Sequence, residues 1–286
     1  MDNRELVIRN MRRGELDTLV DWAAAEGWNP GLSDAEIFWA TDADGFIAAE
    51  LDGAMVGGGS IVSYGGHFGF MGFFIVAPEY RGRGLGDILW HARLKRLIGR
   101  LQSPAVIGMD GVFDMQAWYA KGGFRFACRD LRFETVAQSF PAPRDIRELA
   151  EIDFAETDAY DRAHFPAPRS GFLRRWLAQP GAHALGHVRD DRLNGFGVVR
   201  PCRQGFKIGP LFADTPDIAE DLYRALSIRI SGENIYIDVP EDNRAAMALA
   251  GRHGMKKVFG CAKMFFGPRP VLPESEIFGV TTFELG

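Results

Sequence analysis

The segment from Phe73 to Gly86, Phe-Phe-Ile-Val-Ala-Pro-Glu-Tyr-Arg-Gly-Arg-Gly-Leu-Gly, constrains the fold of this chain more than any other. Its apolar start predicts a short buried strand, and its glycines predict a sharp turn. Apolar residues from Leu85 to Leu101 then recur at the spacing of an amphipathic helix. Such a turn gathers backbone N–H groups at the positive end of a helix dipole, and Arg81 and Arg83 add positive charge. The segment therefore suits a diphosphate group.

Two well-known nucleotide-binding patterns do not match this segment. A P-loop requires GxxxxGK followed by Ser or Thr, and a dinucleotide fingerprint requires GxGxxG in a βαβ unit with a downstream acid. Here the order is RxxGxG, and it follows a strand that comes after two hairpin-like strands. On these residues alone, a tight connection with solvated arginines remains the simpler alternative.

The first half of the chain predicts the order strand, two helices, three strands, helix, strand, helix, strand. The expected elements are a strand at 6–9, helices at 15–26 and from Ser33, strands at 46–51, 55–64 and 67–76, a helix at 85–101, a strand at 105–109, a helix at 113–121 and a strand at 124–135.

Nearly the same order follows in the second half, with helical stretches at 146–163 and 170–177, strands at 182–189, 192–200 and 205–213, a helix at 216–230, a strand at 234–239, a helix at 243–253 and a strand at 257–266. The segment Tyr119-Ala-Lys-Gly-Gly-Phe124 also parallels Ala250-Gly-Arg-His-Gly-Met255. Internal duplication explains both observations. We therefore expect two tandem domains, 1–136 and 144–286, joined by a linker at 137–143. Residues 277–283 are expected to add a further strand.

The loop Arg81-Gly-Arg-Gly-Leu-Gly86, preceded by Ile75-Val-Ala-Pro-Glu-Tyr80, closely resembles the acyl-CoA-binding motif of the GNAT superfamily of N-acetyltransferases. The 119–124 segment resembles the later helix-to-strand motif of that family. The resemblance implies an α/β fold of two tandem GNAT-like domains, each with a mostly antiparallel, mixed central sheet flanked by helices. It also implies acetyl-CoA as co-substrate and no metal. The residues expected to bind acetyl-CoA are Phe74, Ile75, Val76, Arg81, Gly82, Arg83, Gly84, Leu85 and Gly86.

Tyr119 matches the tyrosine that serves this family as general acid beside the CoA sulfur. A phenol is a neutral donor at pH 7, so it can protonate a departing thiolate. The alternative is a helix tyrosine that packs under the last strand. One residue departs from the family pattern: Val112 stands where many members carry an Asn that contacts CoA, so no side-chain contact to CoA is expected from that position.

The acceptor side is less specific. The resemblance places Trp28 and Asn29 in a loop that lines the acceptor pocket, and Tyr64 is expected to reach the same region. For Trp28, a hydrophobic plug is an equal alternative, although an aromatic wall also suits a cationic amine. Asp110 ends the strand beside the acyl-binding strand, whereas His67 and Glu50 lie on or near the sheet. None of these three is identified as the base, because the proton often leaves through a water chain in this family.

The second half lacks the catalytic motifs. Its matching stretch, 209–221, contains no Arg-x-x-Gly-x-Gly and carries four acids, Asp214, Asp217, Glu220 and Asp221, which would repel a diphosphate. Ala250 stands at the position of Tyr119, although the missing Asn does appear, as Asn243. We expect a degenerate GNAT-like domain that binds no CoA and contributes to the acceptor pocket.

Bulk properties narrow the function classes. The formal net charge is −5 and no Lys/Arg-rich block occurs, which argues against nucleic acid as a partner. The three cysteines have no metal-site spacing and are expected to be reduced thiols. No apolar run reaches the about 20 residues of a membrane helix, and the N-terminus lacks the apolar core of a signal peptide, so no membrane association and a cytoplasmic location are expected. The oligomeric state is not predicted.

The expected function is transfer of an acetyl group to a primary amine of a small molecule, with a peptide amine less favoured. A longer acyl donor is a second option, which the bulky Phe73-Phe74 pair mildly disfavours. The alternative from a different class is a sensor that binds acyl-CoA without catalysis.

Overall fold

The structure is a computed structural model that describes residues 6–286. Its first half follows the expected order with two differences. The strand expected at 55–64 is divided into β3 and β4, and the strand expected at 67–76 is divided into β5 and β6. The elements of this half are β1 (Leu6–Asn10), α1 (Arg13–Ala25), α2 (Asp34–Thr41), β2 (Phe46–Leu51), β3 (Ala54–Ser60), β4 (Val62–Tyr64), β5 (Phe68–Phe70), β6 (Ile75–Val76), α3 (Leu85–Ile98), β7 (Ile107–Val112), α4 (Gln116–Lys121) and β8 (Arg125–Val136).

The second half repeats this order. The expected helical stretch at 146–163 begins instead with a short strand, so this half also starts β, α, α. Its elements are β9 (Ile146–Glu148), α5 (Phe154–His164), α6 (Ser170–Leu177), β10 (His183–Arg189), β11 (Arg192–Pro201), β12 (Phe206–Ala213), α7 (Pro216–Arg229), β13 (Asn234–Pro240), α8 (Arg244–Arg252), β14 (Lys256–Phe266) and β15 (Ile277–Gly279). The further strand expected at 277–283 is formed only by its first three residues, which pair with β12.

The repeat extends to the hydrogen bonds that end α4 and α8. The N–H of Phe124 donates to Tyr119 O, and the N–H of Met255 donates to Ala250 O. The glycines before Phe124 and Met255 both have positive φ, 91° and 60°, which is the usual way to end a helix before a strand. The two halves therefore share local geometry as well as element order, as internal duplication predicts.

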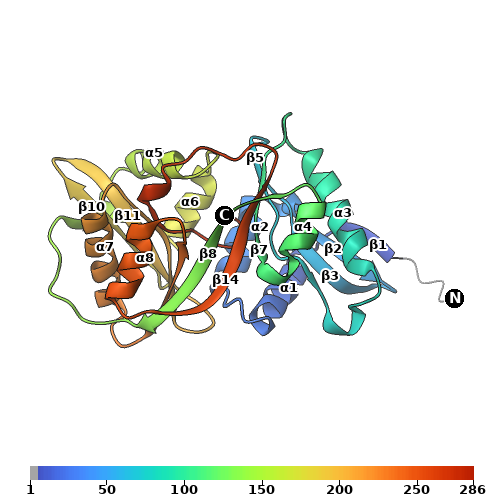
Figure 1. Ribbon diagram of the computed structural model, residues 1–286, viewed down its shortest axis with the longest axis horizontal. Helices are drawn as coiled ribbons and strands as arrows, with labels where there is room; N and C mark the ends of the chain where they lie inside the picture. Colours follow the sequence, from blue (N-terminus) through green and yellow to red (C-terminus); the bar gives the residue numbers. More distant parts are fainter. Residues whose placement is uncertain (1–5) are drawn as a thin grey trace.

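The two halves exchange their last strands. Strand β14, from the second half, lies between β7 and β8 and is antiparallel to both. Strand β8, from the first half, pairs in turn with β13. The result is an eleven-stranded sheet that runs through both halves, beside a four-stranded sheet of β1, β2, β3 and β6. Figure 1 shows β8 and β14 running together through the middle of the molecule. The linker expected at 137–143 separates the two halves in the sequence. In space, each half includes the last strand of the other half.

The interface between the halves is part of the hydrophobic core. Phe38 stacks on Trp176 with ring centroids 6.2 Å apart, and Tyr64 meets Phe165 edge-on at 4.9 Å. The C-terminus lies at the centre of the molecule (Figure 1). There Arg169 donates to the carbonyl oxygen of Gly286 and to the hydroxyl of Thr281. The last residues are therefore a structural part of the interface.

Candidate active site

The two sheets separate where β5 gives way to β6. Strands β3 and β6 pair only at Gly57 with Val76 and at Gly58 with Ile75, whereas β4 and β5 belong to the larger sheet. The chain crosses between the sheets at residues 71–74. In this crossing Phe73 has a φ of 49°, an uncommon value for a bulky residue and one that concentrates at functional sites. The separation leaves backbone N–H groups unpaired: those of Phe73 and Phe74 find no acceptor within residues 6–286.

A cavity of about 480 Å³ lies at this separation. The first half contributes the glycine-rich loop, the end of β6, one face of α3, α4 and the end of β7. The second half contributes Phe259, Cys261, Phe283 and Glu284. The cavity is therefore built across both halves.

The glycine-rich loop forms an open cradle at one end of the cavity. Gly82 and Gly84 have φ values of 74° and 76°, and a Cβ at either position would meet nothing within 4 Å. Gly84 is the residue before α3, so the first N–H groups of the helix point into the cradle. The N–H groups of residues 82–86 have no acceptor in the part of the chain that the structure describes. Free donors at the positive end of a helix dipole fit the diphosphate of CoA.

The two arginines of the loop have different surroundings. Arg81 lines the cavity, and its guanidinium is held by the carbonyl oxygen of Val76 at 2.8 Å and by the carboxylate of Glu26. Arg83 is exposed, donates to Glu79 O and lies 5.3 Å from the ring centroid of Tyr80, outside the cavity lining. Of the predicted CoA residues, the structure places all but Arg83 on the cavity. Their contacts with CoA stay predictions.

Tyr119 projects from α4 into the middle of the cavity. Its ring packs on Trp90 and Trp118, with centroids 5.2 and 5.6 Å away. A Cβ on Gly111 would lie 2.3 Å from this ring, so the glycine makes room for it. The hydroxyl makes no hydrogen bond to residues 6–286, which leaves it available to a ligand. Burial raises the pKa of Tyr119 to about 12, although Arg93 opposes the shift, so the phenol remains protonated at neutral pH.

Arg93 was not predicted from the sequence. Its side chain projects from α3, is fully buried, and donates through Nη2 to the carbonyl oxygens of Ser60 and Gly72, both at 2.6 Å. Its guanidinium lies 5.2 Å from the ring centroid of Phe74, and no carboxylate pairs with it among the described residues. Burial lowers the pKa of Arg93 to about 9. It ties the end of β3 to the crossing segment at Gly72 and brings positive charge close to Tyr119.

Asp110 also lines the cavity, and it lies within β7 rather than after the end of that strand as expected. Its carboxylate oxygens are both buried and receive no hydrogen bond from residues 6–286. Strand exchange places Lys263 of β14 directly opposite Asp110, but the Lys263 ammonium pairs with Asp130 at 2.7 Å. Burial, together with the charge of Asp130, raises the pKa of the Asp110 carboxyl well above its ordinary value.

Trp28 lines the cavity, but Asn29 does not. Strand β8 and the second half fix this loop: Arg132 of β8 donates to Trp28 O at 2.6 Å, and Lys207 of β12 donates to Asn29 O at 3.0 Å. The Asn29 side chain exchanges two hydrogen bonds of 2.9 Å with the backbone of Gln204. The Asn29 side chain therefore positions the loop, and it does not line the cavity at which we expected it to contact the acceptor.

Tyr64 does not line the cavity either. It is buried between the halves, where its hydroxyl donates to Leu285 O at 2.8 Å. Tyr64 was expected at the acceptor, but it instead holds the C-terminal segment, of which Phe283 and Glu284 line the cavity. The other two residues considered as bases also lie elsewhere, since Glu50 binds Arg9 at 2.7 Å and His67 lies in the exposed turn before β5.

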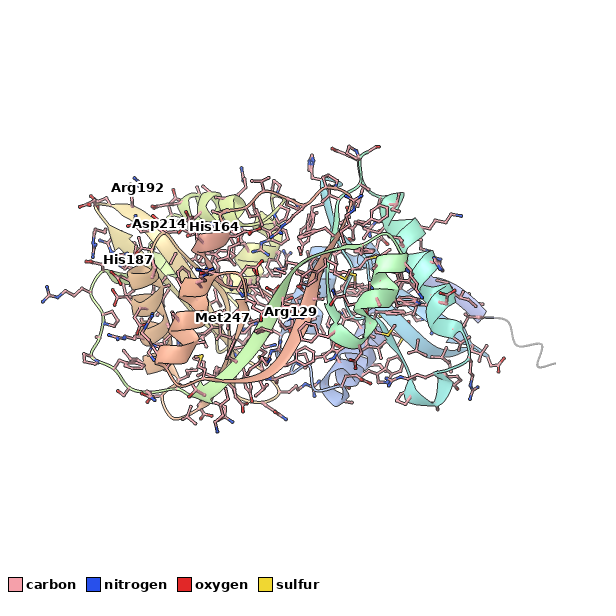
Figure 2. The ribbon with its side chains drawn as sticks, in the orientation of Figure 1. Arg129, His164, His187, Arg192, Asp214 and Met247 are labelled. Atoms are coloured by element: carbon pink, nitrogen blue, oxygen red, sulfur yellow. The ribbon has the colours of Figure 1, made fainter. Side chains whose placement is uncertain are left out.

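The corresponding region of the second half is closed. Strands β11 and β12 pair from Gly195–Ala213 to Pro201–Phe206 with one register shift, so no separation opens between them. Asp214, at the end of β12, accepts a 2.6 Å hydrogen bond from Tyr160, whose ring stacks on His164. Figure 2 shows Asp214 and His164 near each other within the second half. Asn243 is occupied as the N-cap of α8. At that place this half has no glycine cradle, and Thr215 caps α7 by accepting from the N–H of Ile218.

Family models match both halves of the chain. One described as the acetyltransferase (GNAT) family matches residues 13–124, and one described as an acetyltransferase (GNAT) domain matches residues 158–279. An acetyltransferase of Photorhabdus laumondii is 35% identical over 100 residues, which cover 32% of this chain and 67% of that protein. The chain belongs to the GNAT family of acetyltransferases. It is an acyltransferase of tandem type, and enzymes of this family use acyl-CoA as co-substrate.

Longer matches span both halves of this GNAT protein. A holothin acyltransferase of Pseudoalteromonas sp. (strain SANK 73390) is 27% identical over 268 residues, 93% of this chain and 90% of that protein. The crystal structure of a putative acetyltransferase from Pyrococcus horikoshii matches with a TM-score of 0.82 at 23% identity, over 98% of this chain and 96% of that chain. A tandem GNAT protein from the clavulanic acid biosynthesis pathway matches with a TM-score of 0.63 at 13% identity, over 93% and 100%. The predicted tandem fold is confirmed.

Residues 6–286 lack a membrane-spanning helix and a metal-binding cluster. No helix there is long and apolar enough to cross a bilayer. No cluster of His, Cys, Asp or Glu side chains there has the arrangement of a metal site.

Proposed function

We propose that this enzyme transfers an acetyl group from acetyl-CoA directly to a primary amine of a small molecule. The observation that carries the proposal is that one cavity joins three features: the cradle at Gly82–Gly86, the free hydroxyl of Tyr119 and the unpartnered carboxylate of Asp110. These features suit the diphosphate, the leaving sulfur and the acceptor nitrogen of one transfer reaction.

The residues of the cavity fit acyl-CoA and supply the groups that transfer requires. Bound acyl-CoA supplies the acyl group as an activated thioester. The N–H of Phe74, free where the sheets separate, donates to the thioester oxygen as negative charge develops there. Tyr119 donates its proton to the departing sulfur, a role that its high pKa makes possible over the physiological range.

Direct transfer is favoured over a covalent cysteine intermediate. Cys261 lines the cavity, but burial and the charge of Asp110 raise its pKa well above the ordinary value. Since the thiolate is the nucleophilic form, a thiol with a raised pKa is a poor acyl carrier. The amine is therefore expected to attack the thioester itself.

A short acyl group is favoured by the aromatic wall beside Tyr119. Phe74 stacks on Trp118 at 5.8 Å and packs on Trp90 at 5.6 Å, and all three rings line the cavity. They narrow the space around the reacting carbon. The relative that acylates holothin carries the broader description of acyltransferase, so propionyl, succinyl and longer donors belong in the same test.

The test measures thiol release from acetyl-CoA with the purified full-length protein and a panel of primary amines, holothin included, with product mass confirmed by mass spectrometry. We expect release to depend on an amine and the product to have the mass of the amine with one hydrogen replaced by an acetyl group. Tight CoA binding by calorimetry without release for any amine would favour the sensor function instead. A lysine peptide acetylated faster than every small amine would contradict the proposed acceptor class.

A further inference from the structure

The acceptor end of the cavity contains one carboxyl group, that of Asp110, with which no cation of residues 6–286 forms an ion pair. Asp110 and Asp130 contribute two carboxylates and Lys263 one ammonium, and that ammonium pairs with Asp130 at 2.7 Å. Asp238, the next acid, forms two hydrogen bonds of 2.6 and 2.8 Å with Arg132. The buried oxygens of Asp110 are left without a donor. Because buried polar groups are almost always satisfied, an ammonium in the cavity is the partner that this site lacks.

Apolar rings line the same cavity as Asp110. Trp28 lines the cavity from the first half, and Phe259 and Phe283 line it from the second, with their ring centroids 6.2 Å apart. Cys261 adds a buried thiol that remains neutral. Flat, rigid walls of this kind match a flat apolar group by stacking and area burial.

The same end has no cation to receive a substrate carboxylate. Arg132 is bound to Asp238 and to Trp28 O, and Lys263 is bound to Asp130. Arg93 lines the cavity with Nε and Nη1 buried and unpartnered, but its charge acts on Tyr119 rather than on Asp110, and its guanidinium is packed against Gly59. Glu284, which is 2% exposed, adds a second carboxylate to the lining. A carboxylate on the acceptor would therefore meet like charge in a buried site, which costs several kcal/mol.

We propose that the acceptor is a primary amine on a compact, flat, apolar body without a carboxylate, and that Asp110 binds its ammonium and takes one proton from it. This inference rests on the proposed function and specifies its substrate.

The proton balance of this step closes. The ammonium gives one proton to Asp110, which later releases it to solvent, and the neutral nitrogen forms the C–N bond as the C–S bond breaks. Tyr119 gives its proton to the sulfur and regains one from the attacking nitrogen, which leaves a neutral amide and a thiol. Burial raises the pKa of the Asp110 carboxyl, which makes its carboxylate a stronger base than an ordinary one and so suits the first transfer. The charged or titratable groups that face Asp110 are Lys263, Asp130, Asp238, Cys128 and Cys261.

The experiment compares kcat/KM for three amines with the wild-type enzyme: phenethylamine, phenylalanine and putrescine. Phenethylamine and phenylalanine share the flat body and differ by the carboxylate, whereas putrescine lacks the flat body. We expect phenethylamine to exceed phenylalanine by about 100-fold or more, the factor that corresponds to a few kcal/mol of like-charge repulsion, and to exceed putrescine by at least about tenfold. Comparable rates for the three amines would overturn the inference while leaving amine acetylation established.

A variant tests Asp110 separately. We expect Asp110→Asn to lower kcat/KM for phenethylamine by about 10²- to 10⁴-fold, to remove the acid limb of the pH profile, and to leave CoA affinity unchanged. Glu241→Gln, an acid on the surface beside Arg129, is the control that keeps the wild-type profile. An Asp110→Asn enzyme that keeps both rate and acid limb would refute the role of Asp110. Absence of thiol release with every amine would instead refute the proposed function, and this inference with it.

Discussion

Replacing Tyr119 by Phe removes one hydroxyl and leaves the rest of the site unchanged. The ring keeps its packing on Trp90 and Trp118 and its place over Gly111. The hydroxyl makes no hydrogen bond to residues 6–286, so its removal leaves no protein group without a partner. We therefore expect the free energy of unfolding to change by no more than about 0.5 kcal/mol.

The effect on turnover should be much larger. A positioned general acid contributes about 10²- to 10⁴-fold, which corresponds to about 2.7 to 5.5 kcal/mol of the activation barrier. Because the pKa of Tyr119 is about 12, it stays protonated throughout the usable range. The wild-type rate should therefore show no alkaline decline due to this residue below about pH 11.

The assay measures kcat from thiol release at saturating amine, CoA affinity by calorimetry and stability by urea denaturation. Tyr160→Phe is the matched control, since that hydroxyl donates to Asp214 and to Asn194 O in the closed second half. We expect the control to lose about 1 kcal/mol of stability and to keep its turnover. The Tyr119 variant should lose turnover and keep its stability.

We thus expect the two variants to differ in opposite ways in turnover and in stability. A Tyr119→Phe enzyme within about threefold of wild-type kcat would remove this tyrosine from the mechanism. A large loss of stability in that variant would instead show that its hydroxyl has a structural partner.

Three further predictions address the cradle, the interface and pH. Gly84→Glu should abolish CoA binding in calorimetry, because the side chain enters an open cradle and adds like charge. The control Gly232→Glu, at an equally open position of positive φ, should keep CoA binding. Equal CoA affinities of the two variants would refute the placement of CoA at the cradle. Arg132→Met should cost about 3 to 5 kcal/mol of unfolding free energy, since it leaves Asp238 buried and unpaired, and a loss below about 1 kcal/mol would contradict this. Asp110 has a raised folded pKa, so its stability contribution is present below the ordinary carboxyl pKa of about 4 and is lost as pH rises through the folded value. Asp110→Asn should therefore gain stability over wild type as pH rises from 4 to 9, and a constant difference would refute it.

Local features of the sequence predicted the loop and the order of elements well. Gly82 and Gly84 have the positive φ that only glycine adopts readily, and the helix begins at Leu85, so composition and geometry coincide within a few residues. The repeated caps at Gly123 and Gly254 were visible for the same reason. Turns and helix caps depend on residues that are adjacent in the sequence, so a short segment is enough to predict them.

Features that depend on distant residues were missed. Residues 67–76 read as one apolar strand, yet the chain leaves the sheet at Gly72, where a Cβ would lie 2.1 Å from the carbonyl oxygen of Glu284. The alternation of apolar and polar residues in β8 and β14 would suit a sheet position in either half. The sequence pattern therefore does not specify the exchange of strands. Arg93 and Glu284 stand out in the sequence only as charged residues within apolar stretches. That pattern suggests a buried charge but does not say which distant residues it will contact.

The exchange of last strands explains why a half without catalytic motifs remains part of the enzyme. With each last strand in its own half, β14 would not lie beside β7, and Cys261 and Lys263 would not reach Asp110. The same exchange places Arg132 of β8 against Asp238 of β13, from where it donates to Trp28 O. On the proposed function, binding of CoA and recognition of the acceptor would be divided between the two copies, and substitutions of Phe259 or Phe283 would alter the acceptor wall without touching the cradle. A second copy without a CoA cradle would be free to vary that wall, because CoA binding would impose no constraint on its sequence.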